Sequence, residues 1–198
     1  MKLVGITKYL YEMGHLKHLK RSGWWRIGVR EPESVAEHSY RTAIIGYILA
    51  SLEGADPEKT ASICLFHDTA EARIGDLSWV AKRYLQVKEG EKAALQEQTE
   101  QLPQKIADRI VTLTNEYNER TSQEAQLARE ADILECLLQA REYEMSGYTK
   151  GLEWAKMCRD GLQNSTARNL ADTCLTNDPG DWFQDLQSNP HSKGTNPA

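Results

Sequence analysis

The sequence predicts an all-α protein, a globular bundle of about eight helices, from three observations. Along most of the 198 residues, apolar side chains recur at intervals of three and four, which is the spacing of one helix face. No run typical of a β-strand is longer than four residues. Residues that start helices and glycines that stop them stand at the ends of these segments. We therefore expect a single domain over residues 1–186 and a polar, disordered tail over 187–198.

The two helices predicted first are marked by an apolar stripe and by a capping motif. The stripe predicts a first helix of about five turns that ends before Gly23, and its members are Leu3, Ile6, Leu10, Met13 and Leu16. The second helix is expected to begin after Pro32, where Ser34 and Glu37 have the spacing of a capping box, and to end at Gly54. Its apolar face is expected to consist of Ala43, Ile44, Tyr47, Ile48 and Leu52.

The rest of the chain contains further helical segments. Asp56 and Pro57 stand in the order of a cap and a first helical residue, and their helix is expected to reach His67 and Asp68. The pattern is weak from 69 to 85, and a polar stretch over 90–101 is expected on the surface. The remaining helices are expected from Pro103 onward, over 122–145, near 151–162 and over 165–175.

Composition excludes several classes of function. The net charge of −5 does not favour a nucleic-acid polymer or an anionic membrane surface as a partner. The longest apolar run, Ile44 to Leu52, is too short to span a bilayer. The four cysteines are scattered without a Cys-x-x-Cys pair, and the opening residues lack a secretory signal. We therefore expect a soluble, cytoplasmic protein with reduced thiols.

A set of metal-binding residue types stands on the predicted helices. His38 lies just inside the capped helix, His67 is directly followed by Asp68, and Asp132 interrupts the apolar face of the long helix. Two imidazoles with carboxylates suit a divalent transition metal or magnesium better than a closed thiolate zinc site. Glu71 follows Asp68 by three residues, so a helical continuation would place it on the same surface.

Each of these residues also has a simpler interpretation when it is taken singly. The His67-Asp68 pair is typical of helix capping or hydrogen bonding, and Asp132 has a salt-bridge partner in Arg129 one turn away. His38 alone is typical of a hydrogen-bonded helix histidine. Only the combination favours a metal site.

Two extended motifs carry a resemblance to a known family. They are Pro32-Glu33-Ser34-Val35-Ala36-Glu37-His38-Ser39 and His67-Asp68-x-x-Glu71-x-x-x-Gly75-Asp76-Leu77. With Asp132 further on, they resemble the HD-domain metal-dependent phosphohydrolase superfamily, and within it the 5'-deoxynucleotidase branch. The resemblance covers residues 1–175. It implies an HD-domain-like helical bundle that removes the 5'-phosphate from deoxyribonucleoside monophosphates.

The resemblance also implies a cofactor and a set of residue roles. It implies one divalent ion (Mn, Co, Mg, Ni or Zn), a small nucleotide substrate and a homodimer. The metal ligands that it implies are His38, His67, Asp68 and Asp132. Glu71 and Asp76 fall on the acidic catalytic positions. We expect Glu71 to orient or deprotonate the attacking water, and Asp76 to deliver a proton to the leaving 5' oxygen or to hold the sugar.

Substrate contacts follow from the same resemblance. Trp24 falls where the family carries a tryptophan that packs near the sugar and disfavours a 2'-hydroxyl. Gly23 replaces the arginine that precedes this tryptophan in bacterial relatives, so Arg21 is the nearest candidate. Asp68, Asp76 and Asp132 are also expected to contact substrate.

Three further arginines are candidates for the phosphate, or else ordinary surface residues: Arg26, Arg30 and Arg41. Trp25 is expected in the core. Two alternative functions stay open. One is another HD-type phosphohydrolase that acts on nucleoside triphosphates or phosphodiesters, and the other is a non-catalytic helical adaptor that keeps a metal for folding. The two extra acids, Glu71 and Asp76, favour an enzyme over the adaptor.

Overall fold

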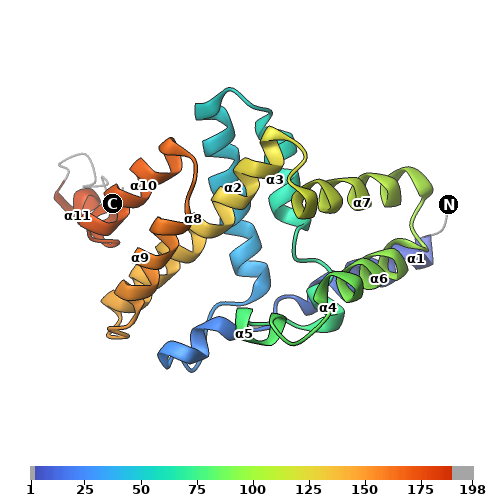
Figure 1. Cartoon of the computed structure of the whole chain (residues 1–198), viewed down its shortest axis with the longest axis horizontal. Coiled ribbons are helices and arrows are strands. Elements are labelled where there is room, and N and C mark those ends of the chain that lie inside the picture. Colours follow the sequence, from blue (N-terminus) through green and yellow to red (C-terminus); the bar gives the residue numbers. More distant parts are fainter. Residues whose placement is uncertain (1–2, 189–198) are drawn as a thin grey trace, which may run out of the picture.

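The computed structural model describes residues 3–188, and these residues form eleven α-helices and one short 3-10 helix with no β-strand among them (Figure 1). The all-α prediction is confirmed. In chain order the helices are α1 (Leu3–His15), η1 (Ser22–Ile27), α2 (Val35–Glu53), α3 (Pro57–Phe66), α4 (Glu71–Ile74), α5 (Trp79–Lys82), α6 (Val87–Thr99), α7 (Gln104–Glu119), α8 (Gln123–Met145), α9 (Gly151–Gly161), α10 (Ser165–Thr176) and α11 (Asp181–Ser188). No helix in this part of the chain is both long and apolar enough to cross a membrane.

Helix α2 lies at the centre of the molecule and packs against both α3 and α8 (Figure 1). Leu49 of α2, Ile63 of α3 and Leu137 of α8 are fully buried where these helices meet. Helices α9 and α10 extend this core along α8. Of the residues that the sequence singles out for metal binding, His38 and Asp132 lie on α2 and α8, and His67 and Asp68 follow the end of α3.

A second, smaller core joins α1, α6 and α7. Tyr9, Leu95 and Ile110 are buried in it. Phe66, the last residue of α3, packs against both cores. The chain that follows Phe66 therefore runs along the junction between the two cores, and this segment holds His67, Asp68 and Glu71.

The predicted first helix is too long. Helix α1 ends at His15, and the residues before Gly28 form η1 instead. The chain turns after His15 because Lys20 pairs with Ser34 in an isolated antiparallel bridge. The carbonyl oxygens of Leu16 and Leu19 then accept hydrogen bonds from the first backbone amides of α2, which a longer α1 would prevent.

The predicted apolar face of α2 is wrong. Four of its five members are exposed to solvent, namely Ile44, Tyr47, Ile48 and Leu52. The buried face contains His38, Thr42, Ile45 and Leu49 instead, because this side contacts α3 and α8. The helix is apolar on both sides, so its spacing pattern alone does not identify the buried one.

Several predicted helix ends are confirmed. Ser34 and Glu37 form both bonds of a capping box, and Asp56 and Ser122 cap α3 and α8. The polar stretch that becomes α6 is only partly on the surface, because Leu95 and its neighbours are buried against α1 and α7. Helix α11 was not expected, and it takes in the first two residues of the expected tail, while 189–198 lie outside the described residues.

Candidate active site

Three elements of the central core bring four candidate ligands together. His38 comes from α2, His67 and Asp68 follow the end of α3, and Asp132 comes from α8. One ligand atom from each of His38, His67 and Asp68 lies within 4.8 Å of the other two. Asp132 Oδ1 lies 3.3 Å from His38 Nε2. Residues far apart in the sequence therefore form one compact cluster.

The free atoms of this cluster suit a divalent metal ion. His67 Nδ1 is 2.6 Å from the backbone oxygen of Cys64, whereas its buried Nε2 makes no hydrogen bond within the described chain and lies 3.1 Å from Asp68 Oδ2. Asp132 Oδ2 accepts hydrogen bonds from Tyr117 and Arg129, which leaves Oδ1 turned toward His38. Imidazole nitrogens and carboxylate oxygens are ligands for zinc, iron, nickel and manganese, and the carboxylates also suit magnesium. The residues present therefore fit the cofactor that the sequence implies.

Burial and charge act against each other in this cluster. Burial and the Arg21 cation each lower the pKa of His38, but the carboxylates of Glu135 and Asp132 outweigh them and raise it to about 10. Burial raises the pKa of Asp132, but the hydrogen bond with His38 and the charge of Arg129 hold it well below its ordinary value. The concentrated negative charge stabilises a bound cation.

Two more acids lie beside the cluster in a pocket of about 410 Å³. Glu71 is only 3% exposed, and its Oε2 atom is buried without a hydrogen-bond partner in the described structure. Burial first, and then the charges of Asp68 and Asp76, raise the pKa of Glu71 to about 10. Asp76 Oδ2 accepts a 2.5 Å hydrogen bond from the Ser22 backbone amide. The pocket thus holds one acid whose pKa is raised by burial and one acid that is held in place by a backbone amide.

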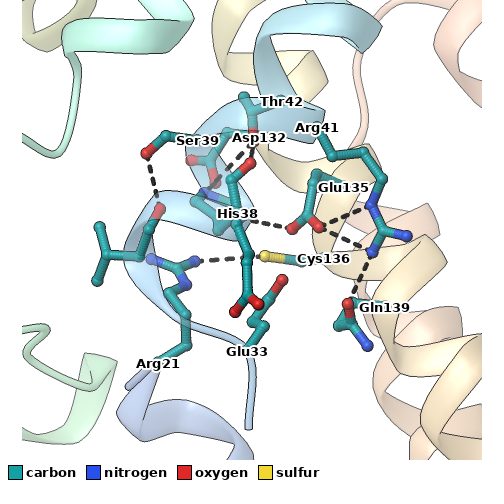
Figure 2. Close-up of polar contacts among 12 residues, drawn as sticks. Arg21, Glu33, His38, Ser39, Arg41, Thr42, Asp132, Glu135, Cys136 and Gln139 are labelled. Carbon is teal, nitrogen blue, oxygen red and sulfur yellow. Dashed lines mark hydrogen bonds and ion pairs between the residues drawn. The ribbon is translucent and has the colours of Figure 1, made fainter. Parts of the chain in front are cut away.

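Arg21 supplies a positive charge at the same place. Its Nη1 donates to Asp68 at 3.3 Å and to Asp76 at 3.2 Å. Its Nη2 lies 3.6 Å from the sulfur of Cys136, a contact drawn in Figure 2. Arg21 therefore bridges Asp68 of the cluster and Asp76, and all three residues line the pocket.

Of the two adjacent tryptophans, only Trp24 is buried. It is 2% exposed, lines the pocket, and packs against Trp154 at 5.0 Å between ring centroids. Its Nε1 donates a 2.9 Å hydrogen bond to Glu33. Burial and the charge of Glu135 raise the pKa of Glu33 to about 7. Trp25 is 55% exposed, so its expected place in the core is wrong.

The three additional arginines lie apart from the metal cluster. Arg41 lines a different pocket and is tied to Glu135. Arg26 lies over the ring of Trp79 at the rim of the acidic pocket, 5.3 Å from the ring centroid. Arg30 is exposed.

Sequence reasoning missed three contacts around the site: those of Tyr117 and Glu135 with the cluster, and that of Glu33 with Trp24. Glu135 carried a detectable signal, because it follows Asp132 by three residues and therefore lies on the same side of α8. An acid one helical turn after a buried acid in a core helix needs a partner. The roles of Glu33 and Tyr117 depend on the folding of distant segments and left no such signal.

Comparison with known proteins shows which proteins most of the chain resembles. The model of the HD domain family matches residues 13–170. The 5'-deoxynucleotidase HDDC2 of Mus musculus is 31% identical over 71% of this chain and 70% of its own length. The HDDC2 protein of Dictyostelium discoideum is 37% identical over 66% of this chain and 73% of its own.

Solved structures are similar as well. A conserved hypothetical protein from Pyrococcus furiosus is 34% identical and superposes with a TM-score of 0.71 over 85% of this chain and 98% of its own. The PH0347 protein of Pyrococcus horikoshii is 30% identical, with a TM-score of 0.67 over the same shares of the two chains.

Proposed function

This chain belongs to the HD domain family, and we propose from that premise that it is a metal-dependent 5'-nucleotidase. Its proposed reaction is the hydrolysis of (deoxy)ribonucleoside 5'-monophosphates to a nucleoside and phosphate. The relatives in mouse and Dictyostelium carry the name 5'-deoxynucleotidase. The proposed catalytic domain comprises residues 1–186.

One observation carries the proposal. The candidate ligands His38, His67, Asp68 and Asp132 lie next to a pocket that is also lined by three further acids, Glu71, Asp76 and Glu91. A metal site that served only the fold would have no use for Glu71, whose buried Oε2 lacks a partner among the described residues. An unpaired carboxyl oxygen beside a metal site is suited to hold a water or a substrate group.

The proposed division of roles follows the geometry. His38, His67, Asp68 and Asp132 would hold the divalent ion, which when bound supplies charge neutralisation for a phosphate and a lowered pKa for a coordinated water. Glu71 would orient the attacking water or accept its proton through the unpaired Oε2. Asp76 is fixed by the Ser22 amide and by Arg21, which also bonds Asp68, and there it would assist proton delivery to the leaving oxygen or hold the sugar. Arg21 balances the charge of the transferred phosphate.

The pocket supports a small substrate. Its volume of about 410 Å³ is within the range of small-ligand sites. Trp24 lines it and is immobilised by its bond to Glu33 and by its packing on Trp154, which suits a rigid wall beside a sugar. The net charge of −5 is unfavourable for a polynucleotide.

A phosphate-release screen tests this function. The metal-stripped protein is supplied with manganese, cobalt, magnesium, nickel or zinc and given deoxyribonucleoside and ribonucleoside 5'-monophosphates, a nucleoside triphosphate and a phosphodiester. We expect metal-dependent release of phosphate from the monophosphates. Release from the triphosphate or the diester alone, or no turnover with any metal, would contradict the proposal.

We also propose a homodimer in the cytoplasm. The side of α2 that faces away from the core exposes Ile44, Tyr47, Ile48 and Leu52, and an apolar strip of this kind is typical of a subunit interface. All four cysteines are free thiols, which suits a reducing compartment. Light scattering coupled to gel filtration tests the dimer, and Ile48→Lys should shift it toward monomer.

A further inference from the structure

A buried carboxylate joins the metal-site histidine to an arginine behind it. Glu135 is fully buried, and its Oε2 lies 2.5 Å from Nδ1 of His38. Its other oxygen, Oε1, accepts hydrogen bonds from Nε and Nη2 of Arg41, at 3.0 and 2.9 Å. Figure 2 shows the three side chains in a row, with Glu135 in the middle. Both oxygens of Glu135 are therefore engaged.

The packing of two helices fixes this row. His38 and Arg41 are one turn apart on α2, and the residues that meet them follow one side of α8. Beyond Glu135, Arg41 donates to Gln139 at 2.8 Å and to Glu142 at 2.6 Å. Because four hydrogen bonds hold the guanidinium, it in turn holds the Glu135 carboxylate in one orientation.

The row determines which nitrogen of His38 is free. A carboxylate that accepts at Nδ1 favours the tautomer with its proton on Nδ1, which leaves the lone pair on Nε2. Nε2 faces the metal-site acids, 3.3 Å from Asp132 and 3.8 Å from Asp68. With the proton on Nε2 instead, the ring would present a donor to the ion and could not bind it.

We propose that Glu135, held by Arg41, is a positioning residue that keeps His38 in the Nδ1–H tautomer and directs its Nε2 at the divalent ion. The inference rests on the metal site of the proposed function. It goes beyond that function because it assigns Glu135 and Arg41, which do not line the catalytic pocket.

A direct ligand role for Glu135 does not account for its contacts. Atoms of His38, Glu135 and Cys136 are close enough to form a second candidate metal group. However, an ion there would have to displace Arg41 from Oε1 or His38 from Oε2 in a place with no solvent exposure. The remaining alternative is a clamp that only joins α2 to α8.

Manganese affinity separates positioning from a simple clamp. Glu135→Gln keeps the shape of the side chain but replaces one acceptor oxygen with a donor nitrogen. That nitrogen would then face either the donors of Arg41 or the protonated Nδ1 of His38. We expect the dissociation constant of Mn²⁺, measured from the electron paramagnetic resonance signal of free Mn²⁺, to rise about 10- to 100-fold. A dissociation constant equal to that of the unaltered protein would overturn the proposal.

The matched control is Glu130→Gln. Glu130 is also a buried acid of α8, but it accepts hydrogen bonds from the backbone amides of Gln163 and Asn164, away from the site. We expect this variant to be less stable. Its Mn²⁺ affinity should stay within about twofold of that of the unaltered protein, because the side chain of Glu130 contacts no candidate metal ligand. Equal losses of affinity in the two variants would mean that Glu135 acts only through the stability of α8.

A second substitution keeps the proposal testable if Glu135→Gln does not fold. Arg41→Met leaves Glu135 on His38 but removes its restraint, so we expect a weakening of Mn²⁺ affinity that is smaller than that of Glu135→Gln. In the double variant the amide can turn its oxygen to His38 without facing a cation, and part of the lost affinity should return. No change in Arg41→Met would overturn the role of the arginine.

The unaltered protein provides the decisive measurement. With Zn²⁺ as a diamagnetic probe, long-range ¹H–¹⁵N spectra report which ring nitrogen of His38 is protonated. We expect a protonated Nδ1 and a zinc-bound Nε2. A protonated Nε2 with zinc bound at Nδ1 would overturn this inference but leave the proposed function standing. Failure of the unaltered protein to bind Mn²⁺ or Zn²⁺ would contradict the proposed function as well.

Discussion

Gly46 of α2 packs directly against Cys64 of α3, where a Cβ added to the glycine would lie only 2.6 Å from the Cys64 sulfur. The missing side chain lets the two helices approach closely. One end of α2 carries His38, and His67 follows the end of α3; the two imidazole rings are 5.5 Å apart between centroids. The close approach therefore contributes to the spacing of the metal site.

Gly46→Ala should lower the free energy of unfolding by about 1–3 kcal/mol, because the added methyl overpacks a buried contact. Chemical denaturation measures the loss. Gly14→Ala is the control, since a Cβ at Gly14 of α1 meets nothing within 4 Å and alanine favours a helix. Gly46→Ala combined with Cys64→Ala should recover stability, and a failure to recover would show that the sulfur is not the obstacle.

Glu71→Gln should separate turnover from metal binding. The amide cannot exchange a proton at the position of Oε2, so we expect kcat to fall by about 10²- to 10⁴-fold. Metal content, measured by mass spectrometry of the purified variant, should stay near that of the unaltered protein.

The matched control for Glu71 is Glu91→Gln, because Glu91 lines the same pocket from α6 and the proposal gives it no catalytic role. We expect it to keep most of its turnover. If Glu71→Gln kept the kcat of the unaltered protein, or if its activity fell only because it lost its metal, the assigned role would be wrong.

Trp24→Phe tests the wall beside the sugar. The smaller ring leaves space and loses the indole hydrogen bond to Glu33. We expect the ratio of kcat/KM for a deoxyribonucleotide over its ribonucleotide to fall about tenfold, the scale of discrimination that a shaped pocket gives. Trp25→Phe is the control because that ring is largely exposed. The same ratio in both variants and the unaltered protein would exclude Trp24 from sugar selection.

An ion-pair cluster away from the site predicts a pH dependence of stability. Lys59 of α3 lies 2.8 Å from Glu116 of α7 and 3.2 Å from Glu124 of α8. The hydrogen bond from Lys59 holds the pKa of Glu116 below its ordinary value of 4.5, and the bond to Glu116 raises the pKa of Lys59 above 10.5. A lowered carboxyl pKa gives stability above pH 4.5 that is lost in acid, and a raised lysine pKa gives stability that is lost in strong base.

Lys59→Met should therefore lower the free energy of unfolding by at most about 1 kcal/mol near neutral pH. The difference from the unaltered protein should shrink as the pH falls below 4.5. Urea denaturation at several pH values measures it. Lys105→Met on α7 is the control, since Lys105 forms no salt bridge within the described residues. A difference that grows in acid would contradict the assignment.

The candidate metal ligands could be chosen from the sequence because the features that mark them are local. His67 and Asp68 are adjacent, Glu71 lies one turn further, and the capping box that starts α2 fixes the position of His38. The residue types also restrict the chemistry, since a metal site needs imidazoles and carboxylates.

The contacts that hold the candidate ligands and line the pocket could not be predicted from the sequence, because they depend on how the helices pack. The role of Glu135 requires the crossing of α2 and α8, which places it on His38 from 97 residues away in sequence. Trp24 and Trp25 look alike in the sequence, and only the fold of η1 buries the first and exposes the second. The buried side of α2 was missed for the same reason, since both of its sides are apolar.

The proposed function depends most directly on one ion bound by side chains from α2, the end of α3 and α8. Anomalous-scattering data from crystals soaked in manganese test it. We expect a single strong peak within bonding distance of His38, His67, Asp68 and Asp132. No peak there, with both imidazoles hydrogen-bonded to other groups, would contradict the account.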